Sequence, residues 1–121
     1  KNDLEFVLFG GCDNNGEQMS LLDQARLFNQ AKIVTGPHGG ALANIIYISQ
    51  ENKCKVCEFT SGIHTAIQRN VSNFGKNYNN LLARAPETYL DYFLIPLTKK
   101  SNKKYTSIDI ENYKTFLSMC I

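Results

Sequence analysis

The chain has 121 residues, which is enough for one domain with a single hydrophobic core. Apolar residues make up 43% of the sequence, a fraction typical of globular domains, and this excludes an intrinsically disordered chain. The formal net charge of +2 is too small to indicate a nucleic-acid-binding protein, and no apolar run is long enough to cross a bilayer. The charged start is unlike a signal peptide, so we expect a membrane anchor or targeting segment only upstream of these residues.

The start of the chain predicts a strand, a loop and a helix. Residues 4–9 form an apolar run that ends at a glycine pair, which is typical of a strand, and the polar residues 12–18 indicate a loop. Ser20 and Asp23 match a capping box, so a helix is expected to begin there. Its apolar face is predicted from four residues at helical spacing, namely Leu21, Ala25, Phe28 and Ala31.

The central part predicts a strand, a helix, a strand and a further helix. Residues 32–35 form a short apolar strand that is expected to end at Gly36-Pro37. Residues 40–48 are apolar almost all round, which predicts a buried helix. A third strand is predicted over 55–59, and a helix over 64–73.

The last part predicts one more strand and a terminal helix. The strand is expected over 89–95, closed by Pro96, and a solvated loop follows over 99–104. Thr106 and Asp109 match a second capping box. The helix after them is amphipathic, with its apolar face formed by Ile110, Tyr113, Leu117 and Cys120.

This alternation of strands and helices predicts an α/β domain of four strand-helix units. Such a pattern is typical of a Rossmann-like parallel sheet flanked by helices. Ligands of parallel sheets bind beyond the carboxyl ends of the strands, where loops meet helix N-termini. The residues that follow Thr35 and Phe59 are therefore the expected places for a binding site.

The most informative segment is Thr-Gly-Pro-His-Gly-Gly-Ala at residues 35–41, between a predicted strand and a predicted helix. Its glycines allow close approach of a ligand and positive φ angles, and Pro37 stiffens the loop. The helix start offers N–H groups to an anion, and His38 can donate a hydrogen bond to a phosphate oxygen. A glycine pair alone would indicate only a tight turn with His38 on the surface, but the complete string favours a phosphate site.

The cysteines allow more than one interpretation. The even count of Cys12, Cys54, Cys57 and Cys120 permits two disulfides without requiring them. Cys54 and Cys57 look like half of a zinc site, but a second close pair of ligands is missing. Their odd separation would also place the two thiols on opposite faces of a strand. Buried free cysteines are therefore the expected state.

A family resemblance extends from Asp23 to about residue 60. The residues that carry the resemblance are Asp23-Gln24, Ala31, Ile33-Val34 and Gly36-Pro37-His38-Gly39, with Leu42 and Asn44 in register. This segment resembles the pattern of glycosyltransferase family 61. Gly40 stands where the family usually has Ala, and Ala41 where it often has Gly; both are small. The strand Val56-Cys57-Glu58-Phe59 is similar to the next strand of the family, which commonly carries an acidic residue.

The resemblance implies the C-terminal, donor-binding half of a two-domain GT-B enzyme that inverts the anomeric centre. It implies a nucleotide-sugar donor, expected to be UDP-linked, a glycan or glycoprotein acceptor, no metal and no cofactor. For a eukaryotic protein it also implies the lumen of the Golgi or endoplasmic reticulum. His38 would stabilise charge on the leaving diphosphate. The donor-binding residues implied in this way are Gly36, Pro37, His38, Gly39, Gly40, Ala41, Asn44 and Glu58.

The role of Glu58 and the nature of the whole domain remain open at this stage. Glu58 either binds a ribose or sugar hydroxyl or is a strand-end carboxylate that faces water. The whole domain, residues 1–121, is either part of a longer transferase or a non-catalytic module that binds a nucleotide or phosphate. A hydrolase is disfavoured, because the chain has no Gly-x-Ser-x-Gly nucleophile elbow. No residue is identifiable as the general base.

Overall fold

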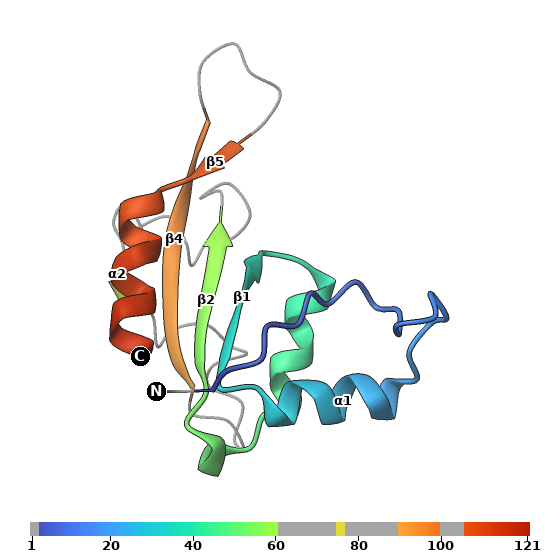
Figure 1. The fold of residues 1–121 in the computed structure, drawn as a ribbon. Helices are drawn as coiled ribbons and strands as arrows, with labels where there is room; N and C mark the ends of the chain where they lie inside the picture. The colour runs from blue at the N-terminus through green and yellow to red at the C-terminus, as the bar shows by residue number, and fades with distance from the viewer. Residues whose placement is uncertain (1–2, 61–74, 77–89, 100–105) are drawn as a thin grey trace.

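The computed structural model describes residues 3–60, 75–76, 90–99 and 106–121. Within these ranges the chain folds around a mixed sheet with helices packed on both of its faces (Figure 1). The helix predicted over 64–73 lies outside the described residues.

The centre of the sheet is parallel. β1 (Ile33–Pro37), β2 (Lys55–Thr60) and β4 (Asp91–Lys99) are parallel neighbours, with β2 in the middle. Two short strands, β3 (Gly75–Lys76) and β5 (Thr106–Ile108), pair antiparallel with β4. The predicted α/β class with parallel strands is confirmed for β1, β2 and β4, whereas an all-parallel sheet of four repeated units is not. Antiparallel strands at the edge of a parallel sheet are a common variation.

The helices separate onto the two faces of the sheet. α1 (Leu21–Gln30) and the 3₁₀ helix η1 (Gly40–Tyr47) lie on one face, and α2 (Ile110–Cys120) lies on the other (Figure 1). A short 3₁₀ turn, η2 (Gln50–Asn52), precedes β2. The parallel strands thus form the middle layer, and their carboxyl ends lie at one common edge.

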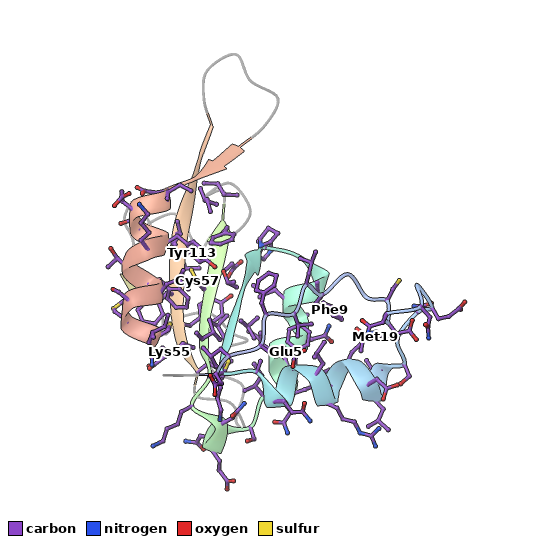
Figure 2. All side chains as sticks on the ribbon, in the orientation of Figure 1. Glu5, Phe9, Met19, Lys55, Cys57 and Tyr113 are labelled. Carbon is purple, nitrogen blue, oxygen red and sulfur yellow. The ribbon has the colours of Figure 1, made fainter. Side chains whose placement is uncertain are left out.

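Each face of the sheet carries its own apolar cluster. On the α1/η1 face, Val56, Tyr92 and Leu94 of the sheet pack with the helices, and the other buried members are Phe28, Leu42, Ile45, Ile48, Cys54 and Leu90. On the α2 face, Cys57, Phe93 and Ile95 pack against the fully buried Phe116. Figure 2 shows Cys57 and Tyr113 between α2 and the sheet, whereas Phe9 lies on the side of α1 and η1. The alternation of side chains along β2 and β4 therefore supplies both cores.

The strand predicted over residues 4–9 is wrong. This segment is extended but forms no ladder with any other described strand, and Phe6 and Leu8 are 84% and 85% exposed. Only its last residue is anchored, since the Phe9 ring meets that of Phe28 edge-on at 5.1 Å. Strand propensity is realised only where a neighbouring strand supplies hydrogen-bond partners.

Proline ends one of the two strands that contain it. β1 ends at Pro37, as the Gly36-Pro37 pair predicts, whereas β4 continues past Pro96 to Lys99, so the predicted end at Pro96 is wrong. Proline is tolerated in β1 because this strand is at an edge of the sheet. Pro96 lies where β4 exchanges its parallel partner β2 for its antiparallel partner β5.

The first helix starts as the capping box predicts, and the last one does not. The Ser20 side chain accepts a hydrogen bond from the Asp23 N–H at 3.1 Å and caps α1. Within the predicted face of this helix, Phe28 is buried whereas Leu21 is 65% exposed. For α2 the N-cap is Asp109, whose carboxylate accepts from the N–H groups of Glu111 and Asn112. Thr106, the predicted cap, is in β5 instead.

The helix predicted over 40–48 is present, but as a 3₁₀ helix with one buried face. In this helix type residues three apart lie above one another. Leu42, Ile45 and Ile48 follow that spacing and are buried, whereas Ile46 is 42% exposed. The expectation that this helix is buried therefore holds for one face only, because its spacing gathers only every third side chain against the sheet.

Candidate functional site

The loop after β1 is held firmly at the carboxyl edge of the sheet. Pro37 pairs with Phe59 of β2, and the His38 N–H then donates to the Phe59 carbonyl at 2.9 Å. This bond extends the β1–β2 ladder by one residue, so His38 follows the alternation of the strand. His38 consequently lies on the same face as Val34 and Gly36, which is the face covered by α1 and η1.

The backbone conformation does not require glycine at positions 36, 39 and 40. Left-handed φ angles occur, among the described glycines, only at Gly11 and Gly16, and Gly39 is extended with φ 163°. The expectation that the loop uses positive φ angles is therefore wrong. A Cβ atom built at Gly36, Gly39 or Gly40 would meet no atom within 4 Å among the described residues. The absence of a side chain thus leaves open space beside the backbone, which is what close approach of a ligand requires.

The first turn of η1 directs N–H groups toward this loop. Gly39 is the N-cap and has no side-chain cap, and the first backbone bond of the turn runs from the Leu42 N–H to the Gly39 carbonyl at 3.1 Å. The N–H groups of Gly40 and Ala41 therefore have no partner within the helix. Such groups at the positive end of a helix favour an anion.

His38 is partly exposed and also contacts the sheet. Its side chain is 46% exposed, and its Nδ1 contacts Oε1 of the Glu58 carboxylate. Gly36 pairs with Glu58 across the β1–β2 ladder, and His38 follows two residues later on the same face of the sheet. The ring is therefore held on the sheet side at one nitrogen while part of it remains accessible to solvent.

Glu58 is fully buried, and it is the one buried charged residue in the part of the chain that the structure describes. Its Oε1 contacts His38, and its Oε2 accepts a hydrogen bond from the Tyr92 hydroxyl. The alternative that Glu58 faces water is therefore wrong. It is buried because β2 is the central strand and both of its faces are covered.

Tyr92 is a member of this cluster that sequence reasoning missed. Burial raises its pKa above the ordinary value of tyrosine, and the hydrogen bond and charge of Glu58 raise the pKa further. The hydroxyl therefore keeps its proton and acts as a donor to the carboxylate. Tyr92 pairs with Val56, two residues before Glu58, so only the register of β2 and β4 brings the two side chains together.

Asn44 lies in the first turns of η1, as expected, and links this helix to α1. Its side-chain amide donates to the Ala41 carbonyl at 3.2 Å and to Oε1 of Gln24 at 3.3 Å. The Gln24 amide in turn donates to the Met19 carbonyl at 3.0 Å. These bonds fix the start of η1 relative to α1 and hence the direction of its N–H groups.

The cysteines form no disulfide with one another. Cys54 belongs to the core on the α1/η1 face and Cys57 to the core on the α2 face, which confirms that the two thiols lie on opposite faces. Burial raises the pKa of both thiols to about 12. Across the described ranges, no group of three or more His, Cys, Asp or Glu side chains is arranged to hold a metal ion.

Fold and site together define an α/β domain with a histidine and helix N–H groups at the carboxyl edge of a parallel sheet. The family model of glycosyltransferase 61 matches residues 15–57, which is less than half of the chain but contains α1, β1 and the whole glycine-rich loop. This match supports the assignment of the chain to glycosyltransferase family 61. No curated protein and no solved structure matches the chain.

The family match indicates a glycosyltransferase and does not favour a non-catalytic binding module. Members of such families in general use a nucleotide-sugar donor and a glycan acceptor. No helix in the described ranges combines the length and the hydrophobicity needed to span a membrane.

Proposed function

We propose that this chain is the donor-binding domain of an inverting glycosyltransferase. The enzyme transfers a sugar from a UDP-linked donor to a hydroxyl group of a glycan or protein. The observation that carries the proposal is the position of His38, Gly39 and Gly40 at the carboxyl edge of the sheet, directly before the first turn of η1. This loop lies inside the stretch that matches the family.

The chemistry of the loop suits a leaving diphosphate. Negative charge builds up on the diphosphate as the bond to the sugar breaks, so groups fixed around it stabilise the transition state. Here those groups are the N–H groups of Gly40 and Ala41 and the imidazole of His38. The open space beside Gly36, Gly39 and Gly40 supports close approach of the phosphates to the backbone. Asn44 contributes by fixing the start of η1.

The proposal includes a longer enzyme of GT-B architecture. In it, residues 1–121 form the C-terminal donor domain, and the acceptor and the general base lie across a cleft in a second domain. Donor binding is proposed to need no metal ion, because the positive groups at the loop neutralise part of the charge of the diphosphate.

Calorimetric titration of the 121-residue chain tests the proposal. The ligands are UDP, UDP-N-acetylglucosamine, UDP-xylose, GDP and inorganic pyrophosphate, each with manganese and with a chelator. We expect at least one UDP-sugar to bind more tightly than GDP and pyrophosphate, with equal affinity in the chelator.

Two results would contradict the proposal in different ways. Equal affinity for UDP, GDP and pyrophosphate would indicate a general phosphate-binding module, because such a module does not discriminate between the nucleotides. Binding that disappears in the chelator would indicate a metal-dependent transferase architecture.

A further inference from the structure

The carboxylate of Glu58 is fully buried in the sheet. Burying a charged group is costly unless it is paired and hydrogen-bonded. Both carboxylate oxygens are engaged, Oε1 with His38 and Oε2 with the Tyr92 hydroxyl. The three side chains come from three adjacent strands: His38 directly follows β1, Glu58 is near the end of β2, and Tyr92 is at the start of β4. They form a connected chain from the core to the half-exposed imidazole.

We propose that Glu58 and Tyr92 are positioning residues for His38, which they hold as the donor to the diphosphate. This inference rests on the proposed function. It assigns Glu58 a role through His38 rather than direct contact with a sugar hydroxyl. Tyr92 fixes the carboxylate, the carboxylate fixes Nδ1, and the opposite ring nitrogen, Nε2, meets the phosphate.

The donor and acceptor inventory supports this order. An ionised carboxylate only accepts hydrogen bonds, so in the proposed arrangement Nδ1 contributes its N–H to Glu58. A ring that donates from Nδ1 and from Nε2 at the same time is an imidazolium, since the neutral ring carries one N–H. The bound diphosphate therefore meets a cation, and Glu58 supplies its counter-charge. Charge-assisted hydrogen bonds of this kind are stronger than neutral ones.

The contact is also specific to this side of the sheet. The Phe59 carbonyl accepts the His38 N–H and fixes the backbone of His38, so the imidazole lies on the face of the sheet that holds Glu58. The neighbouring residues of β2, Cys57 and Phe59, belong to the opposite face and pack near α2. The polar chain is thus confined to the strand positions that lead to the loop.

The test uses conservative variants of the 121-residue chain and UDP as the probe. Glu58→Gln keeps the volume and one acceptor oxygen but removes the charge, and we expect it to lower UDP affinity at least tenfold. Tyr92→Phe keeps the ring, and we expect a loss of about threefold, because it only loosens the carboxylate. The matched control is Glu111→Gln on α2, where the side chain is exposed and pairs with Lys114, and there UDP affinity should change less than twofold.

A double-variant cycle separates positioning from a structural effect. Because Glu58 is proposed to act through His38, Glu58→Gln should cost less than twofold when it is added to His38→Gln. Losses that multiply in the double variant would overturn the proposal, and so would an unchanged affinity in Glu58→Gln.

Nitrogen-15 spectra of the His38 ring give a readout that folding alone does not change. In the ligand-free chain Nδ1 should carry a proton, and in the UDP complex both ring nitrogens should carry one. Glu58→Gln should lose the doubly protonated signature in the complex. A ligand-free ring with no proton on Nδ1 contradicts the positioning role even if UDP binds. If UDP does not bind to the wild-type chain, the proposed function fails, and the ligand-free spectrum alone decides whether Glu58 positions His38.

Discussion

The two faces of the central sheet use the same strands for different purposes. Toward α2, the buried side chains are apolar or thiol groups, with the Phe93 and Phe116 rings 5.2 Å apart. Toward α1 and η1, the same strands bury Glu58 and the hydroxyl of Tyr92 beneath His38. Because adjacent residues of a strand point to opposite faces, one short segment of β2 contributes to both. The comparison teaches that stability and chemistry can be assigned to separate faces, and variants on each face should therefore separate the two properties.

The largest effect is expected on the α2 face. Phe116→Ala should lower the free energy of unfolding by about 3–5 kcal/mol, because a fully buried ring is lost and a cavity remains. The measurement is urea unfolding, with UDP affinity determined for the folded fraction. Phe116→Leu should cost less than Phe116→Ala, because the leucine side chain leaves a smaller cavity. If either variant, once folded, bound UDP more weakly than the wild type, the assignment of stability to the α2 face and of ligand binding to the α1/η1 face would be wrong.

At Gly39 we expect a large loss of UDP affinity with little change in stability. Gly39→Val should weaken UDP binding by more than about 3 kcal/mol, or more than about a hundredfold, because the side chain fills the space proposed for the phosphates. The free energy of unfolding should change by less than about 0.5 kcal/mol, since φ is extended and a Cβ atom meets nothing within 4 Å in the part of the chain that the structure describes. Gly10→Val is the matched control, because a Cβ atom there is equally unobstructed by the described residues and Gly10 is not part of the loop. Equal affinities in the two variants would be inconsistent with a ligand at Gly39.

A smaller effect is expected for the dependence of stability on pH, and it involves one buried thiol on each face of the sheet. Burial raises the pKa of Cys54 and Cys57 to about 12 from 9.0, so these thiols stay neutral in the folded chain while they ionise in the unfolded one. Stability is therefore full below about pH 9 and falls as pH rises toward 12. At pH 9 the loss should be about 0.4 kcal/mol for each thiol, because half of it is ionised in the unfolded chain. Urea unfolding of the wild type, Cys54→Ala and Cys57→Ala at pH 7 and 9 checks this. Each variant should lose less free energy of unfolding between the two pH values than the wild type does, and equal losses in all three proteins would refute the prediction.

The sequence predicted the local features of the site better than its connections. The cap at Ser20, the three parallel strands and the loop between a strand and a helix follow from capping residues, apolar runs and glycines. The strand over residues 4–9 was wrong, because its formation depends on a neighbouring strand rather than on its own apolar residues. The 3₁₀ form of η1 was also missed, although Leu42, Ile45 and Ile48 have the three-residue spacing that could have indicated it.

The contact of Tyr92 with Glu58 could not be predicted, because it depends on strand order and register. The residues of a single strand determine neither its neighbours nor its register. A register shift of one residue would turn Tyr92 to the α2 face. The burial of Glu58 depends in the same way on the central position of β2. The exposure of Leu21 shows the converse, since a helical spacing identifies a possible apolar face but not what covers it.

The central claim is that His38 binds the diphosphate of a donor, and one measurement tests it most directly. Calorimetry of the wild type and His38→Ala should be done with UDP and with uridine, which lacks the phosphates. The account predicts a loss of about 1.5–3 kcal/mol for UDP, roughly 10- to 150-fold in affinity, because a charge-assisted hydrogen bond disappears. Uridine should bind both proteins within about twofold, because it does not reach this loop. An unchanged affinity of His38→Ala for UDP, or an equal loss for UDP and uridine, would contradict the claim.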